Sequence, residues 1–289
     1  MKIKNIITVS AISILMTQVA YAASTRENAD INQLGNDNSA FVRQIGTENN
    51  IQVFQNGDFN QVSAEQTGMR GQANIMQDGT EHSIELNQGG IDNVVSIQQN
   101  GRANSANLGQ SGGTENYQTV NQNGSHNDVD SDQRGIRSDM NLNQQGTGNS
   151  ASLYQSGTED RIDAQQNGDG NFAHADQAGV GSSMQLNQDG DNNHAGGVQL
   201  GSGQDLSIQQ NGSDNWADSF QEGQNNVSTI DQYGSNNFAY ASQHGMDNES
   251  AIMQNGLGNA ATVCQDGTEN IAHINQNGNG NQADVLQGI

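Results

Sequence analysis

The side chains that commonly carry catalysis or bind metals are few and scattered in this chain. Cys264 is the single cysteine, so no disulfide framework within the chain and no multi-cysteine metal site is possible. We expect it to be an inert free thiol or an occasional dimer link. The histidines share no metal-ligand spacing: His82, His126, His174, His194, His244 and His273. These residues predict no catalytic site, no metal site and no cofactor, and therefore a protein that is not an enzyme.

Two acidic patches, Asp128-Val129-Asp130 and Asp189-Gly190-Asp191, raise the alternative of weak Ca²⁺ binding. They match neither the EF-hand loop nor the nonapeptide calcium repeat. We interpret them as a solvated face whose like charges slow premature assembly.

Amide side chains, by contrast, are spaced with great regularity. Glutamine recurs every 11 residues from Gln33 to Gln287, with one 12-residue step after Gln110, and 23 of these 24 glutamines have glycine two residues later. Identical amides on neighbouring strands can hydrogen-bond to one another. Every second glutamine of the series, starting at Gln33, is predicted to form one ladder: Gln33, Gln55, Gln77, Gln99, Gln122, Gln144, Gln166, Gln188, Gln210, Gln232, Gln254 and Gln276.

The elements that position these amides are predicted to be strands. An 11-residue period can also specify a right-handed coiled coil, but a glycine in every repeat would cost such a helix about 1 kcal/mol each. Counting back from Gln265, the residues Val263, Ala261 and Asn259 alternate with their neighbours, as on one face of a strand. Each half-repeat is therefore a strand with inward Asn, Ala, an apolar residue and Gln, followed by a turn at the glycine.

Half-repeats of two kinds alternate, which makes the true unit 22 residues long. The inward residue two before Gln is nearly always large in one kind and often small in the other, whose strands usually begin with Asn. We predict an all-β protein, a β-solenoid of about 12 strand–turn–strand turns with two parallel in-register sheets in a cross-β arrangement. The asparagines predict a second ladder: Asn38, Asn60, Asn104, Asn127, Asn149, Asn171, Asn193, Asn215, Asn237, Asn259 and Asn281. The best-conforming units place turn glycines at Gly146, Gly168, Gly190, Gly212, Gly234, Gly256 and Gly278.

The beginning of the chain has the pattern of an export signal. Lys2 and Lys4 precede an apolar stretch, and Ala20-Tyr21-Ala22 supplies a small-residue cleavage site. The stretch is too short for a membrane span of about 20 residues. We predict a signal peptide at 1–22, a short segment at 23–30, and tandem repeats forming one solenoid at 31–289. The predicted mature chain has seven Arg against 32 acidic residues, which disfavours nucleic acid and anionic membranes as partners.

Neither end of the predicted solenoid shows a cap. Only about eight residues precede the first strand, and the last repeat is regular up to Gln287-Gly288-Ile289. Uncapped ends of a repetitive sheet predict end-to-end addition of subunits.

The unit Q-x-G-x-x-N-x-A-x-x-x-Q resembles the curlin repeat of curli fibres. It is unbroken in nine of the 12 units, as in Gln144-Gly146-Asn149-Ala151-Gln155. The resemblance implies a secreted amyloid subunit of a Gram-negative biofilm matrix, forming pilus-like fibres at the cell surface for adhesion. It also implies partners: further copies of itself, a second curlin subunit as nucleator or co-polymer, and an outer-membrane export pore with accessory factors.

The chain departs from familiar curlins in length, since these have about five units, and it lacks the glycine-rich N-terminal targeting stretch of the major subunit. The regular Gln-x-Gly resembles the minor, nucleating subunit, but the divergent basic last repeat of that subunit is not seen. We favour a fibre-building role, with the nucleator as the alternative. A monomeric solenoid adhesin or ligand-binding protein is a further alternative, but the outward positions are varied and Trp216 is the single tryptophan.

Overall fold

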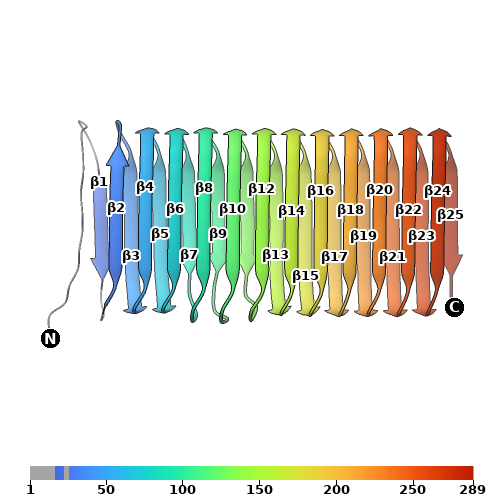
Figure 1. Ribbon diagram of the computed structural model, residues 1–289, viewed down its shortest axis with the longest axis horizontal. Helices are drawn as coiled ribbons and strands as arrows, with labels where there is room; N and C mark the ends of the chain where they lie inside the picture. The colour runs from blue at the N-terminus through green and yellow to red at the C-terminus, as the bar shows by residue number, and fades with distance from the viewer. Residues whose placement is uncertain (1–16, 23–25, 289) are drawn as a thin grey trace. The chain divides into compact units, whose positions relative to one another are not determined.

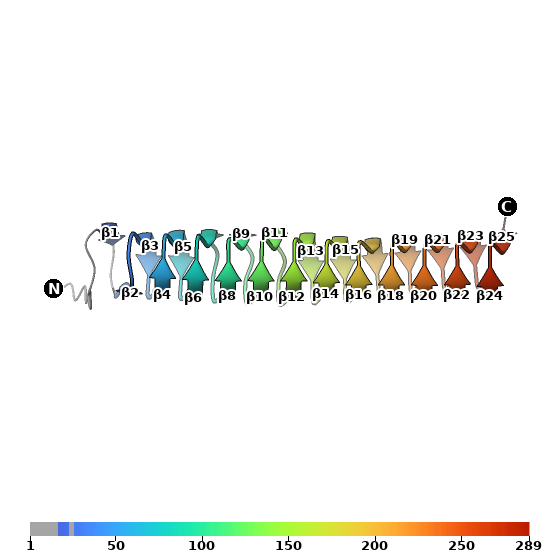
Figure 2. The ribbon, with the colours of Figure 1, turned by 90° about the horizontal axis from the view of Figure 1, so that it is seen from above.

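The computed structural model describes residues 17–22 and 26–288, and every regular element among them is a β-strand. Residues 1–16, which hold most of the predicted signal peptide, lie outside the described residues, as do 23–25 and 289. The chain divides into two compact units, Met1–Thr147 and Gly148–Ile289. Within each unit, successive strands alternate between two sheets (Figures 1 and 2).

The first unit has an even-strand sheet, β2-β4-β6-β8-β10-β12, and an odd-strand sheet, β1-β3-β5-β7-β9-β11. Neighbours pair in parallel and identical slots face each other, so that Gln33 lies opposite Gln55. The strands are β1 (Thr17–Ala22), β2 (Asn28–Leu34), β3 (Ser39–Thr47), β4 (Asn50–Asp58), β5 (Gln61–Met69), β6 (Gln72–Thr80), β7 (Ser83–Gln88), β8 (Val94–Arg102), β9 (Ser105–Gln110), β10 (Tyr117–Ser125), β11 (Asp128–Gln133) and β12 (Asp139–Thr147).

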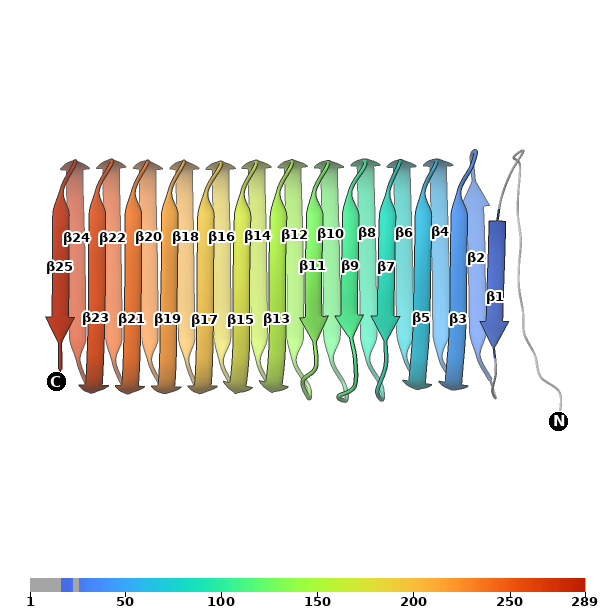
Figure 3. The same ribbon diagram turned by 180° about the vertical axis from the view of Figure 1, so that it is seen from behind.

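The second unit repeats this plan. Figure 3 shows the molecule from the other side, with the odd strands in front. Here Gln210 lies opposite both Gln188 and Gln232. The strands are β13 (Ser150–Thr158), β14 (Arg161–Asp169), β15 (Phe172–Val180), β16 (Ser183–Asp191), β17 (His194–Ser202), β18 (Asp205–Ser213), β19 (Trp216–Gln224), β20 (Val227–Ser235), β21 (Phe238–Met246), β22 (Glu249–Leu257), β23 (Ala260–Thr268), β24 (Ile271–Asn279) and β25 (Gln282–Gln287).

The prediction of an all-β solenoid with parallel in-register sheets and about 12 turns is confirmed, because β2 to β25 supply 24 strands at two per turn. The strands form where the sequence alternates, since Asn38, Ala40, Val42 and Gln44 are all buried while the residues between them are not. That both units belong to one solenoid stays a prediction.

The strands extend further than the repeat suggested, because most run past Gln and through the glycine. The corner then has two backbone positions with positive φ: the glycine, as at Gly212 (φ 131°), and the residue two places later, as at Asp214 (φ 55°). The second position is occupied by Asp, Glu, Asn and even Phe59, although left-handed backbone is strained for such residues. The turn therefore begins inside the strand and is completed after it.

Glycine is required at the first corner position for steric reasons as well. A Cβ built on Gly212 would lie 1.9 Å from the carbonyl oxygen of Gly234, one turn further along. The stacked glycines thus let successive corners lie in direct contact.

The 12-residue step is absorbed in the corner between β9 and β10. After it, Tyr117 pairs with Val94 at an offset of 23 residues instead of 22, and Gln122 still lies opposite Gln99. The inward alternation is unchanged because the extra residue falls outside both strands.

Core residues of the two sheets complement each other in size and polarity. Gly197 lies where a Cβ would come within 2.6 Å of both Met184 and Leu206, so the missing side chain makes room for two large ones. Polar core residues also meet across the sheets, since Ser219 Oγ donates to Ser228 Oγ at 2.9 Å. The core is narrow but closely packed.

The backbone of β1 pairs in parallel with β3, with Thr17 opposite Ser39. This places Ala20 and Ala22, the predicted cleavage residues, opposite Val42 and Gln44. The end of the predicted signal peptide therefore follows the register of the repeats.

Replacing a corner glycine tests the stacked corners. Gly212→Ala should lower the free energy of unfolding by about 3 kcal/mol, because it adds strain and a clash with Gly234. Gly258→Ala, at a φ of 65° with nothing near the added Cβ, should cost about 1 kcal/mol. Denaturant unfolding of both variants measures the difference, and equal losses would contradict this account.

Candidate functional site

The inward glutamines form continuous hydrogen-bonded ladders in each unit. In the second unit Gln188 Nε2 donates to Gln210 Oε1 at 3.0 Å, and Gln210 Nε2 donates to Gln232 Oε1 at 2.9 Å. In the first unit Gln55 Nε2 donates to Gln77 Oε1 at 2.8 Å. These bonds all point the same way, from each amide nitrogen to the glutamine one turn later in the chain, so the ladders are directional.

Each glutamine also ties the two sheets together. Gln210 Nε2 donates a second bond, 2.8 Å long, to the backbone oxygen of His194 on the odd-strand sheet. Gln55 Nε2 likewise bonds Ser39 O at 3.2 Å. Both amide hydrogens are thereby used, which is what a buried amide requires.

The asparagines of the second ladder satisfy the backbone of the corners. Asn215 Oδ1 accepts the backbone N–H of Asn237 at 3.1 Å, and Asn215 Nδ2 donates to Gly234 O at 2.9 Å. In the first unit Asn38 makes the same pair of contacts, with Asn60 N and Gly57 O. Asn is favoured here because its short amide reaches both backbone groups from one inward slot.

The structure has two inward columns in addition to the two ladders that we predicted residue by residue. The other half of the glutamines form a ladder on the odd-strand sheets, as where Gln199 Nε2 donates to Gln221 Oε1 at 2.9 Å. A second corner column precedes the even strands, where Asn226 Oδ1 accepts the N–H of Asn248 at 3.1 Å. The 11-residue spacing of glutamine already marked the first column. The inward slot of the second was predicted for each half-repeat, but its residues are irregular, with Gly71 among them, and were not predicted as a ladder.

His82 occupies an asparagine slot and is buried. Its Nδ1 accepts the backbone N–H of Asn104 at 3.2 Å, and its Nε2 lies 3.3 Å from Asp78 O. Burial lowers the pKa of His82, outweighing the opposing effects of Asp78 and of the backbone groups of Gly101 and Asn104. The neutral ring therefore replaces Asn in the ladder, with the proton on Nε2.

Only two acidic residues in the described chain are buried in inward slots, Glu27 and Asp160. Asp160 Oδ1 accepts the backbone N–H of Ser182 at 2.9 Å, as Asn would. Burial raises the pKa of Asp160. The remaining acids lie on outer faces and at corners, in agreement with the assigned register.

The candidate chemical residues are kept apart by the fold. His174 on β15 and His273 on β24 lie on different sheets. Cys264 is half-buried on β23, and burial, followed by the charges of Asp266 and Asp284, raises its pKa. Across residues 17–22 and 26–288, no group of three or more His, Cys, Asp or Glu side chains is arranged to hold a metal ion.

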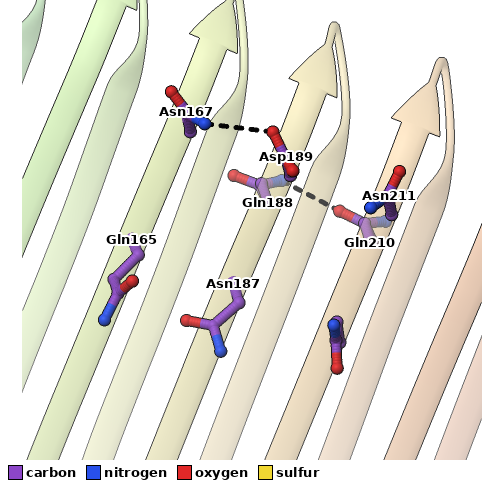
Figure 4. A pocket seen from close by; sticks show the side chains of 8 residues that line it. Gln165, Asn167, Asn187, Gln188, Asp189, Gln210 and Asn211 are labelled. Atoms are coloured by element: carbon purple, nitrogen blue, oxygen red, sulfur yellow. Dashed lines mark hydrogen bonds between the residues drawn. The ribbon is translucent and has the colours of Figure 1, made fainter.

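Carboxylate oxygens of the acidic patches accept hydrogen bonds from residues one turn earlier. Asp189 Oδ1 accepts from Asn167 Nδ2 at 3.1 Å, and Asp191 Oδ1 accepts from Asp169 N at 3.1 Å. Asp130 Oδ1 accepts from Asn107 Nδ2 at 3.0 Å. The outer surface at Asp189 is a shallow pocket across β14, β16 and β18, lined by amides (Figure 4).

The fold and the ladders define a class of protein: a cross-β solenoid whose inner side chains bond from turn to turn. The family model of the curlin associated repeat matches residues 205–234, 212–245 and 223–256. This match over residues 205–256 supports the resemblance to the curlin repeat seen in the sequence. None of the curated proteins compared with the chain matches it. In the described part of the chain, no helix has the length and apolarity needed to cross a membrane.

Removing one amide from the ladder tests its contribution to stability. Gln210→Leu should lower the free energy of unfolding by about 3 kcal/mol, because it leaves Gln188 Nε2 and Gln232 Oε1 buried without this partner. Its exposed neighbour provides the control, and Gln209→Leu should change stability by less than about 0.5 kcal/mol. Equal effects in denaturant unfolding would mean that the inward register is wrong.

His82 should make the fold sensitive to acid. Its pKa is lower in the folded chain than the ordinary 6.5, so the unfolded state binds more protons and stability is lost as pH falls below that value. His82→Asn should remove this loss while keeping the ladder. Unfolding free energies measured between about pH 7.5 and pH 5 should show a smaller decrease for His82→Asn than for the parent protein. The exposed His126→Asn variant should retain the parental decrease.

Proposed function

We propose that the protein is a secreted structural subunit of curli-like amyloid fibres, which polymerises with itself at the surface of a Gram-negative bacterium. Such fibres would support cell adhesion and form part of a biofilm matrix. The observation that carries this proposal is the directional amide ladder, because a ladder of identical rungs can be continued by a second copy without any new kind of contact.

The two ends of a directional ladder are complementary. Gln254 Nε2 donates to Gln276 Oε1 at 2.9 Å, and the same geometry would let Gln276 donate to Gln33 of a second copy. In the same way, Asn281 Oδ1 would accept the backbone N–H of Asn38, as Asn259 Oδ1 accepts that of Asn281 at 3.0 Å. Copies would therefore add head to tail, all in one direction.

Burial at β25 is consistent with such a joint. Its inward residues Ala283, Val285 and Gln287 are only half-buried, whereas Ala261, Val263 and Gln265 on the preceding odd strand are buried. A strand stacked on β25 would cover them, and burying apolar area favours the addition.

A second curlin-like subunit as nucleator or co-polymer, and an outer-membrane export pore with accessory factors, are the partners that this proposal includes. The chain's formal net charge of −23 would oppose premature assembly before export and would disfavour nucleic acid as a ligand. We favour the fibre-building role over nucleation because the last repeat, from Gln276 to Ile289, is regular and has Asp284 as its one charged residue.

Purified protein beginning at Ala23 tests the proposal. It should form fibres that bind amyloid dyes and give a meridional reflection near about 4.7 Å, the spacing of stacked strands. Replacing Gln33 and Gln276 with Ala should raise the critical concentration about tenfold or more, because each joint would lose a buried amide contact. Replacing the outward Asn32 and Asn275 should have little effect. A stable monomer that binds no dye at high concentration would refute the proposal.

A further inference from the structure

The odd-strand sheet of the second unit carries aromatic rings on adjacent strands of its outer face. Phe172, His194, Trp216 and Phe238 occupy equivalent positions on β15, β17, β19 and β21 and lie opposite one another in register. The ring centroids of Phe172 and His194 are 5.0 Å apart, and those of His194 and Trp216 are 3.7 Å apart, both pairs stacked. We call these four residues the aromatic column.

More rings flank the aromatic column on the same face. Tyr154 packs edge-on against His174, with centroids 6.5 Å apart, and Phe220 lies 5.2 Å from His244. Trp216 is 45% exposed and Phe238 is 43% exposed. Rings thus lie on the outer face of five neighbouring strands, from β13 to β21.

The opposite, even-strand face of this unit has no comparable column among its described residues. Val227 and Ile271 are exposed there and share a position in the repeat, but Glu249 lies between them. The amide-lined pocket of Figure 4 occupies another part of that face. The aromatic column is therefore specific to one side of the unit.

Ring orientation argues against a sugar or other flat ligand on this face. The stacked planes are inclined by only 21° and 15°, so both faces of His194 and one face of Trp216 are covered by neighbouring rings. What remains outward is a ridge of ring edges, and ring edges pack well against other rings and aliphatic groups.

Beside the ridge, Gly196 sits in register between His174 and Asp218. Gly196 is buried, and the Asp218 carboxylate lies over it, because a Cβ on Gly196 would come within 2.2 Å of Asp218 Oδ1. The ring edges of the ridge are therefore the apolar groups that this face offers to a second sheet, as side chains do when two sheets pack face to face. Two copies related by a twofold axis would present the same ridge to each other.

The acidic group nearest the column is already partnered. Asp218 Oδ2 accepts from Trp216 Nε1 at 2.6 Å, and its Oδ1 lies 3.4 Å from His194 Nε2. A hydrogen-bonded carboxylate costs less to cover than a free one. Asp176 and Glu222 remain near the face, so approach of a second copy is opposed by like charges that salt can screen.

We infer that this face is a docking surface for the same face of a second copy, so that solenoids pair side by side. Five strands at about 4.8 Å and nine residues at about 3.3 Å give roughly 700 Å² for each copy. The pair would bury about 1,400 Å², within the range of stable specific interfaces. This inference rests on the proposed fibre only for its setting, because two unpolymerised chains could pair in the same way.

Mass per length of fibres, measured by electron microscopy, tests the pairing. Fibres of the Trp216→Ser/Phe238→Ser variant should have half the mass per length of the parent fibres. The matched control, Val227→Ser/Ile271→Ser on the opposite face, should keep the parental value. Equal values for the parent and the Trp216→Ser/Phe238→Ser variant would overturn the inference. Circular dichroism checks that each variant folds, and Phe238→Asp, a single exposed change, replaces the double variant if the latter does not fold.

A second measurement separates this inference from the proposed function. If no fibres form, sedimentation of the soluble parent should show a dimer that dissociates in the Trp216→Ser/Phe238→Ser variant and strengthens as NaCl is raised. Monomers throughout would overturn the pairing. Parent protein that stays unpaired but binds cellulose, with binding lost in this variant, would also overturn it, by assigning the face to a polysaccharide.

Discussion

A buried amide side chain must have hydrogen-bond partners, and the rest of the fold depends on this requirement. Glutamine and asparagine bring polar groups into the interior, where each needs a partner for both its N–H groups and its oxygen. The identical residue one turn away supplies that partner, as between Gln210 and Gln232 at 2.9 Å. The 22-residue repeat, the in-register sheets and the repeated corners together keep each amide within hydrogen-bonding distance of the same residue one turn away.

The ladders also explain how so polar a chain orders itself. With 31% hydrophobic residues and a mean hydropathy of −0.78, apolar burial alone would not offset the entropy of ordering the backbone. The solenoid has a narrow core in which large and small residues alternate between sheets, as Gly197 accommodates Met184 and Leu206. Hydrogen bonds between amides of successive turns then add the stability that the small apolar core does not supply.

Much of this arrangement could be predicted from the sequence because each rung repeats the same requirement. The inward slots of Asn259, Ala261, Val263 and Gln265 followed from alternation alone, and all four are buried. The bonding of the second corner column could not be predicted, although its slot was assigned as inward, since Gly71, Ser138, Asp160 and Asn226 share that slot without sharing a side-chain type. In this column, side chains of different types accept the backbone N–H of the corner, as Asp160 and Asn226 do. The positive φ of the residue two places after each corner glycine was not predicted for a related reason. The closure of the corner sets its backbone conformation, and many residue types occupy the position.

The stacked rings of Phe172, His194 and Trp216 were missed because they belong to outward positions, where the repeat imposes no residue type. Their contact depends on the 22-residue phase, which brings residues far apart in sequence into neighbouring places. His194, which the sequence assigned to no metal site, is one ring of this stack in the fold. Outward positions are where one repeat can differ from another without cost to the ladders.

The corner between β9 and β10 holds an additional residue, yet Gln99 and Gln122 still bond at 2.7 Å. A residue can therefore be added at this corner without changing the strand register, whereas a residue added within a strand would shift it. Such a corner is a natural position for grafting: a peptide placed between Gly112 and Glu115 would project from one edge of the unit while the ladders beneath it stay intact. In a polymer of these chains, the graft would recur once per subunit, giving a periodic display whose spacing is set by the number of turns in the chain.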